Sequence, residues 1–317
     1  MLQILLISAP VYLIIAAGFS AVRFGLFQAA DTRVLGRFVV QIGLPALLFH
    51  ALTRRPLAEV FDARFLLVYG PASLAVGALG LWWQRLRGRS LQHAALTGLG
   101  MSSSNSGFLA YPIVVQVLGP TAAVGLALAM LVENLLMVPL ALALAERGDA
   151  GTRSFTGFLR VLSGLPRSPI IQAMAAGLLV SALEIPLPEV LTRTIGLLAT
   201  ASSPLALFVI GGSLVGLKPA AMRADLALIA GGKLLLHPLA VLGGMALLPG
   251  MDPGLRVAAV LYASAPMLSI YPVLAMRFDL DRLCAAALLT ATTLSFITIT
   301  AWLWLLRAGL HWLPVGG

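Results

Sequence analysis

The chain has 317 residues, of which 60% are hydrophobic and 10% are charged, and its net charge is +9. Soluble domains carry about 25% charged residues, so this composition excludes a water-soluble globular fold and indicates an integral membrane protein. The apolar runs are continuous rather than alternating, which argues against a membrane β-barrel. The basic residues stand in short clusters between apolar runs, as membrane topology requires, so the charge does not predict nucleic-acid binding.

Hydropathy predicts an all-α membrane protein with ten spans, because each span needs about 20 residues. The first apolar run is too long for the core of a signal peptide and is expected to be the first span. The predicted spans, in chain order, are 3–22, 34–53, 65–84, 91–117, 121–145, 169–184, 192–216, 224–248, 255–277 and 283–308.

The loops predict the orientation of these spans. Fourteen of the 21 Lys and Arg residues fall in odd-numbered loops, and six fall in even-numbered loops and the tails. Cytoplasmic loops carry the excess of basic residues, so both termini are expected on the periplasmic side of a bacterial inner membrane. The longest loop divides the chain into residues 1–148 and 169–317, with a cytoplasmic linker at 149–168. Five spans in each half would make the halves inverted repeats.

Short matches support an internal repeat. Leu44–Phe49 in the second span resembles Ser203–Phe208 in the seventh, and Pro71 in the third span corresponds to Pro238 in the eighth. Together with a Tyr-Pro pair in the fourth and ninth spans, three prolines recur in the same order. We therefore predict that the second half repeats the first.

The fourth and ninth spans are each interrupted before their Tyr-Pro pair, in the segments Ser102–Pro112 and Ala263–Pro272, and the two pairs lie 160 residues apart. A helix that stops inside the bilayer leaves backbone groups unpaired unless protein or water covers them. Two matched breaks therefore predict a binding site at the membrane midplane. Proline suits the first turn of a helix, so Pro112 and Pro272 are expected to begin half-helices whose free N–H groups attract an anion. The alternative is that each proline only kinks its helix.

Polar residues beside the breaks are the candidate substrate ligands. Asn105 offers both donors and an acceptor, although it could instead hold two helices together. Gly107 is expected to let the crossing backbone approach closely. The candidate substrate-binding residues are Asn105, Gly107, Tyr111, Pro112, Ser264, Ser269, Tyr271 and Pro272.

Three ionisable residues lie inside the spans. Glu133 and Lys233 would each cost about 2.5–3.5 kcal/mol if they faced lipid, so we expect them to face the interior. They could pair with each other or with His237, which follows Lys233 by one helical turn. Their role would be proton coupling, compensation of a substrate charge, or a structural ion pair. His50 lies near a span end and is expected to be an interfacial residue.

The sequence contains no P-loop and no metalloprotease or serine-hydrolase motif. Cys284 is the single cysteine, which excludes an internal disulfide and a cysteine-based metal site. We therefore expect no catalytic residues, no metal site and no cofactor beyond a coupling proton or sodium ion.

These residues resemble the auxin efflux carrier family, which includes the plant PIN carriers and bacterial malonate and malate permeases. The resemblance covers nearly the whole chain and rests on Asn105–Pro112, Leu44-Pro45, Val209–Leu214 and Lys233–Pro238. It implies five-plus-five inverted repeats with crossed, broken fourth and ninth helices and an organic anion beside the crossing. It also implies a scaffold of spans one, two, six and seven, against which the other spans move, and a homodimer through that scaffold. The ninth span has no Asn near Pro272, so the resemblance does not extend to auxin as the substrate.

The expected function is secondary transport of a small mono- or dicarboxylate by alternating access, and not enzymatic catalysis. One alternative is a sodium-coupled symporter resembling the bile-acid symporter family, with sodium ligands among Ser104, Asn105, Thr121 and Glu133. Another is an intramembrane enzyme that would use His237 with Glu133.

Overall fold

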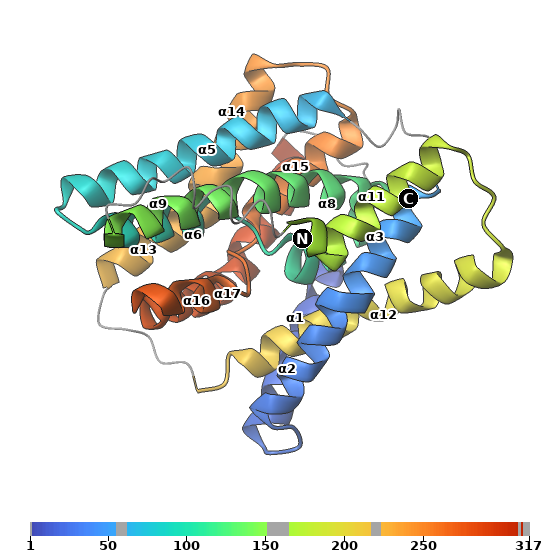
Figure 1. The fold of residues 1–317 in the computed structure, drawn as a ribbon, viewed down its shortest axis with the longest axis horizontal. Coiled ribbons are helices and arrows are strands. Elements are labelled where there is room, and N and C mark those ends of the chain that lie inside the picture. The colour runs from blue at the N-terminus through green and yellow to red at the C-terminus, as the bar shows by residue number, and fades with distance from the viewer. Residues whose placement is uncertain (1, 55–61, 151–164, 217–222, 310–311, 313–317) are drawn as a thin grey trace.

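The computed structural model describes residues 2–54, 62–150, 165–216, 223–309 and 312. Within these residues the secondary structure is helical, and turns and short loops connect the helices (Figure 1). The α-helices of the first half are α1 (Leu2–Arg23), α2 (Ala29–Phe38), α3 (Leu44–Leu52), α5 (Ala63–Leu86), α6 (Leu91–Ser102), α7 (Tyr111–Leu118), α8 (Thr121–Leu131) and α9 (Val138–Ala150). Those of the second half are α11 (Pro169–Ala182), α12 (Glu189–Ser213), α13 (Arg223–Gly231), α14 (His237–Leu247), α15 (Pro253–Ser264), α16 (Tyr271–Ala275) and α17 (Asp281–Trp304).

Six continuous stretches in the described part are long and apolar enough to cross a membrane, and each coincides with a predicted span. They are Ala30–Leu52, Ala63–Leu86, Thr121–Glu146, Glu189–Ser213, Arg223–Leu247 and Asp281–Ala308. The other four predicted spans correspond to α1, to α11, and to two interrupted helices, α6 with α7 and α15 with α16. The all-helical membrane architecture is therefore confirmed, whereas the number of ten spans stays a prediction. Most of the predicted linker at 149–168 lies outside the described residues.

The first interrupted helix starts and stops at polar residues. The hydroxyl of Ser90 accepts a hydrogen bond from the N–H of His93 at 3.2 Å and caps the start of α6. The helix ends at Ser102, and Ser103 is extended, with φ −109° and ψ 139°. Helical structure resumes at Ser106. The hydroxyls of the serines in this segment can bond to nearby backbone groups in place of helical hydrogen bonds. This competition helps to explain why an apolar span breaks at this point.

The second interrupted helix follows the same plan. The carboxylate of Asp252 accepts from the N–H of Leu255 at 3.0 Å, and Pro253 occupies the first turn of α15. The helix ends at Ser264, and Ala265 is extended, with φ −69° and ψ 154°. The residue before a proline is biased away from helical geometry, so Pro266 accounts for the position of this break. Helical structure resumes at Tyr271.

Four spans contain a π-helical turn that ends two residues before a proline. The turns are Val39–Gly43, Ser106–Ala110, Val132–Met137 and Gly232–Leu236, and the prolines that follow are Pro45, Pro112, Pro139 and Pro238. A proline ring collides with the carbonyl four residues earlier and cannot donate a helical hydrogen bond. The wider π turn relieves that conflict. The matched prolines of the predicted repeat differ in this respect, since Pro71 and Pro204 lie inside uninterrupted α-helices.

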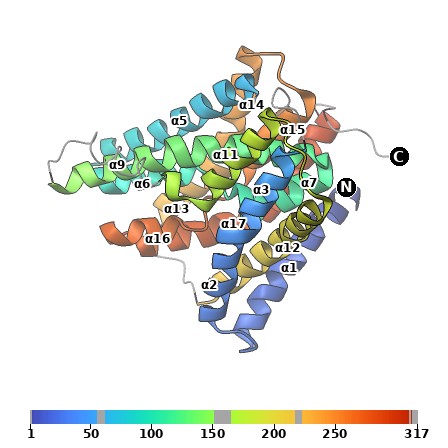
Figure 2. The ribbon, with the colours of Figure 1, turned by 45° about the vertical axis from the view of Figure 1, so that its right-hand side comes forward.

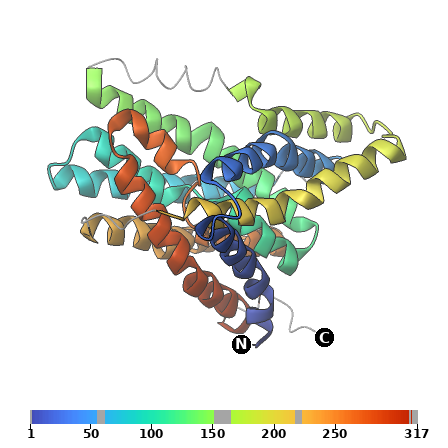
Figure 3. The same cartoon turned by 90° about the horizontal axis from the view of Figure 1, so that it is seen from below.

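The helices pack in two groups. In one group α12 packs on α1, α2 and α3, and α11 packs on α3, so that α12 runs beside the helices of the N-terminal end (Figures 2 and 3). Small residues permit the closest approach, because a Cβ on Gly18 would overlap the carbonyl of Phe208 and one on Gly211 would overlap the carbonyl of Ile15. In the other group α5 packs on α6 and α14, α6 packs on α9, α15 packs on α8 and α14, and α16 packs on α17.

Candidate functional site

The two breaks contact each other in the interior. The backbone N–H of Asn105 donates to the carbonyl oxygen of Pro266 at 2.7 Å. The side-chain Nδ2 of Asn105 donates to the hydroxyl of Ser269, also at 2.7 Å. Asn105 is only 4% exposed, so these bonds satisfy polar groups that water does not reach. The structure therefore brings Asn105 and Ser269, from opposite halves of the chain, to one place.

The first break restarts earlier than the sequence predicted. Pro112 lies in the first turn of α7, as predicted, but helical structure already resumes in the π turn from Ser106 to Ala110, which leads directly into α7. The carbonyl of Asn105 already accepts from the N–H groups of Leu109 and Ala110. The N–H groups without an earlier helical carbonyl are therefore those of residues 106–108. In the second break, Pro272 does lie in the first turn of its short helix.

A carboxylate of the chain itself lies at the restarted first half-helix. Ser106 donates its hydroxyl to Oε1 of Glu133 at 2.6 Å. Tyr69 donates to the same oxygen at 3.4 Å, and its hydroxyl also lies 3.2 Å from Oγ of Ser104. Glu133 is 1% exposed. A negative charge near a helix N-terminus is favourable, so Glu133 complements this helix end without any bound ligand.

A buried cation occupies the complementary position at the second break. The Nζ of Lys233 donates to the carbonyl oxygen of Ala263, in the last turn of α15. Its second partner is Nδ1 of His237, at 2.9 Å. A positive charge near a helix C-terminus is favourable. Lys233 therefore pairs with His237, one of its two predicted partners, and no ion pair within 4 Å joins it to Glu133 among the residues described here.

The hydrogen bonds around His237 fix its tautomer. Because Lys233 can only donate, Nδ1 of His237 must accept, and the ring proton lies on Nε2. Nε2 then donates to the hydroxyl of Ser73 at 2.9 Å, and Ser73 donates to the carbonyl oxygen of Tyr69 at 2.7 Å. The ring of Tyr69 lies 5.5 Å from that of His237. Tyr69 thus touches both buried clusters, the one around Glu133 and the one around Lys233.

Other predicted residues have different neighbours from those expected. Gly107 faces Leu44 of α3, 3.0 Å from the position of an added Cβ, so its close contact is not with the crossing helix. Ser264 donates to the carbonyl of Leu261 in its own helix at 2.9 Å. Tyr271 is 1% exposed and donates to the carbonyl oxygen of Leu96 at 2.8 Å.

The expected sodium ligands do not all converge. Ser104 and Glu133 belong to one hydrogen-bonded cluster through Tyr69. Thr121 is the first residue of α8 and precedes Glu133 by 12 residues in the same span. At 1.5 Å per residue this separation is about 18 Å, so Thr121 cannot share an ion with Glu133.

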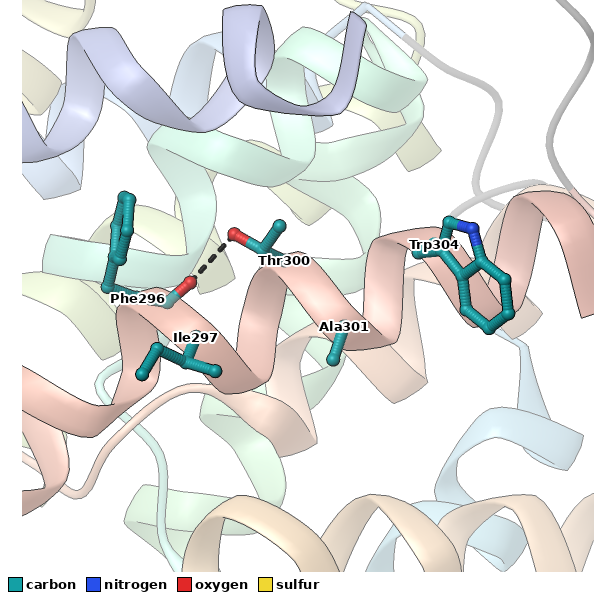
Figure 4. A pocket seen from close by; sticks show the side chains of 5 residues that line it. All are labelled: Phe296, Ile297, Thr300, Ala301 and Trp304. Carbon is teal, nitrogen blue, oxygen red and sulfur yellow. Dashed lines mark hydrogen bonds between the residues drawn. The ribbon is translucent and has the colours of Figure 1, made fainter. Parts of the chain in front are cut away.

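A cavity of about 560 Å³ follows one face of α17 (Figure 4). It is lined by Phe296, Ile297, Thr300, Ala301 and Trp304. The hydroxyl of Thr300 donates to the carbonyl oxygen of Phe296 at 2.7 Å and is not available as a donor to an anion. This apolar face suits contact with lipid better than binding of a carboxylate.

Sequence reasoning missed two members of the buried clusters. Tyr69 and Ser73 lie one turn apart in α5 and both are fully buried. Their spacing places them on one face of the helix, and a paired Tyr and Ser inside an apolar span is the signal that could have identified them. Ser106, the partner of Glu133, lies in the interrupted segment Ser102–Pro112 but was not among the candidate substrate-binding residues.

Comparisons with known proteins are consistent with this architecture. A protein named "Putative malonate transporter" from Rhizobium meliloti (strain 1021) is 29% identical over 281 residues, which cover 87% of each chain. The "Uncharacterized transporter YfdV" of Escherichia coli (strain K12) is 26% identical over 302 residues, 93% of this chain and 95% of that protein. The family described as "Membrane transport protein" matches residues 4–303. The chain therefore belongs to this membrane transport protein family, in agreement with its resemblance to the auxin efflux carriers.

Proposed function

We propose that the chain is a secondary transporter of a small organic anion, a mono- or dicarboxylate such as malonate, and that it binds this anion where the two broken helices cross. The observation that carries the proposal is the double contact of Asn105 with Pro266 and Ser269. The side-chain nitrogen Nδ2 of Asn105 carries two N–H groups. One of them donates to Ser269, so the other can donate to a carboxylate oxygen. The name of the 29% identical relative supports malonate as the first substrate to test.

Alternating access would follow from relative motion of the two helix groups. The group of α1, α2, α3, α11 and α12 would be the scaffold, and the group containing both crossings would move against it. Matching contacts support an inverted repeat of ten spans: α1 packs on α12 as α11 packs on α3, and α7 packs on α8 as α16 packs on α17. Exchanging the two halves of the chain converts each contact into the other, as a pseudo-two-fold axis would.

Glu133, Lys233 and His237 would couple transport to a proton or compensate the charge of the substrate. Their support is position, since Glu133 and Lys233 each bond to a group at one of the breaks. A substrate carboxylate arriving at the crossing would change the electric field at both residues.

The remaining parts of the proposal are a bacterial inner-membrane location with periplasmic termini and a homodimer through the scaffold group.

Uptake by the purified protein in liposomes tests this function. Labelled malonate should accumulate inside, and imposing a pH gradient should change the rate if protons are coupled. Replacing sodium with potassium on both sides should leave the rate unchanged. Uptake that requires sodium would favour the symporter alternative, and absence of uptake for any mono- or dicarboxylate tested would contradict anion transport.

A further inference from the structure

A second, more polar cavity lies between the two helix groups. It has a volume of about 740 Å³ and is enclosed by residues of α3, α7, α8 and α12. Its lining includes two groups that can carry positive charge and three hydroxyl-bearing residues: His50, Arg54, Tyr111, Thr200 and Ser203. No acidic residue is among those that line it in the described part of the chain. Ligand cavities typically measure about 300–1,000 Å³, so this volume suits a small anion with its hydration shell.

His50 and Arg54 lie on one side of the cavity. His50 lies in the last turn of α3, and Arg54 follows it by four residues, just after the end of that helix. Residues with this spacing lie on the same face. An Arg guanidinium binds a carboxylate through two parallel hydrogen bonds. Gly196 of α12 leaves room for the imidazole of His50, because a Cβ at this position would lie only 3.2 Å from Cε1 of that ring.

The cavity also extends toward the crossing. Tyr111, which lines it, is the residue that follows the π turn Ser106–Ala110. It is six residues from Asn105, or about 9 Å along a helix axis. The other lining segments are the end of α3, the turn at Pro120 between α7 and α8, and the middle of α12 from Gly196 to Pro204. The cavity therefore joins one face of the protein to the neighbourhood of the crossing.

We propose that this cavity is a receiving site in which His50 and Arg54 bind the carboxylate substrate before it reaches the crossing. The proposal rests on the proposed function for the identity of the ligand. The positive charge of Arg54 raises the local concentration of an anion and its rate of capture, and the imidazole of His50 can donate a hydrogen bond to it. Tyr111 and Ser203 provide hydroxyls at the inner part of the path. Thr200 contributes little as a donor, because its hydroxyl donates to the carbonyl oxygen of Gly196 at 2.8 Å.

The site predicts a specific change in transport kinetics. Arg54→Gln should raise the KM for malonate about tenfold, the effect of losing one charged hydrogen bond, while the maximal rate changes less than twofold. Arg193→Gln is the matched control. Arg193 lies in α12 and is paired with Glu189 at 3.4 Å, but it does not line the cavity. Equal KM values for the Arg54 variant, the control and the parent would overturn the receiving site and leave transport itself intact.

A labelling experiment tests the site even without transport. Ser203→Cys places a thiol in the cavity, and the parent protein, whose Cys284 is buried, gives the background. Anionic and cationic methanethiosulfonate reagents are compared, each relative to a small thiol in solution. We expect the anionic reagent to label the Ser203→Cys protein faster than the cationic reagent does. Millimolar malonate should slow this labelling, and Arg54→Gln should remove the difference between the two reagents.

The outcomes separate the two proposals. Labelling that is independent of reagent charge and unaffected by malonate would overturn the receiving site, whatever the uptake assay shows. Anion-selective labelling that malonate slows, in a protein that takes up no carboxylate, would support the receiving site as an anion site and contradict the proposed transport function.

Discussion

The backbone N–H of Asn105 and the carbonyl oxygen of Pro266 are joined by a hydrogen bond of 2.7 Å. These two residues belong to opposite halves of the chain, and each lies where a helix is interrupted. A backbone bond at the crossing holds the two breaks in register without using any side chain. The amide side chain of Asn105 is therefore free to donate to Ser269, and its second N–H is the one that the proposed carboxylate would accept.

The buried charges should depend on each other. Lys233→Met removes the donor to Ala263 and His237, and leaving a buried acceptor unsatisfied costs about 1–3 kcal/mol. Glu133→Gln keeps a polar group beside Ser106 and should cost less. Because the two charges act at the same crossing, the double variant should lose less stability than the sum of the single variants. Thermal unfolding of the four proteins in detergent measures this difference.

An exposed ion pair provides the comparison for these single and double variants. Arg277 and Glu146 lie 3.2 Å apart, and the arginine side chain is 64% exposed. Surface pairs contribute about 0–1 kcal/mol, so Arg277→Met should shift the unfolding temperature little. Strictly additive losses for Lys233→Met and Glu133→Gln would show that the buried charges are independent.

Tyr69 should matter for transport more than for stability. Tyr69→Phe removes one hydroxyl, which contacts Ser104 and Glu133, and the expected loss of stability is about 1 kcal/mol. Uptake should fall about tenfold, because small displacements of groups at a functional site are costly. Tyr12→Phe is the control, since its hydroxyl lies 3.4 Å from that of Ser295, which belongs to neither cluster. Similar uptake rates in the two variants would contradict a special role for Tyr69.

Close packing of α1 on α12 should be sensitive to a single methyl group. In Gly211→Ala the new Cβ would overlap the carbonyl of Ile15, and overpacking costs about 1–3 kcal/mol. Gly243→Ala meets no atom within 4 Å and should stabilise α14 by about 0.5–1 kcal/mol. Unfolding temperatures measured side by side should move in opposite directions. A stabilised Gly211→Ala protein would contradict the close approach of these helices.

The apolar runs predicted the positions of the helices well, because span length is set by the thickness of the bilayer. The segments Ser102–Pro112 and Ala263–Pro272, each ending in a Tyr-Pro pair, predicted the two breaks. The π turn before Pro112 was not predicted, because hydropathy does not distinguish a π turn from irregular backbone.

Side-chain partners could not be predicted from spacing within one helix. Arg54 is one of the six basic residues of the even-numbered loops and tails, which were used only to predict orientation, and His50 was expected to be an interfacial residue. Both line a cavity because α12 and α7 approach α3, a relation between segments more than 50 residues apart. Tyr69 and Glu133 are similarly brought together from different spans.

Binding of malonate to the Asn105→Ala protein tests the central claim most directly. Isothermal titration in detergent should give an affinity at least about tenfold weaker than that of the parent, because a hydrogen bond to a charged ligand contributes about 1.5–3 kcal/mol. Asn134→Ala is the matched control, since its amide donates to the carbonyl oxygen of Met130 in its own helix at 2.9 Å, and it should bind like the parent. An unchanged dissociation constant in a folded Asn105→Ala protein would contradict binding at the crossing.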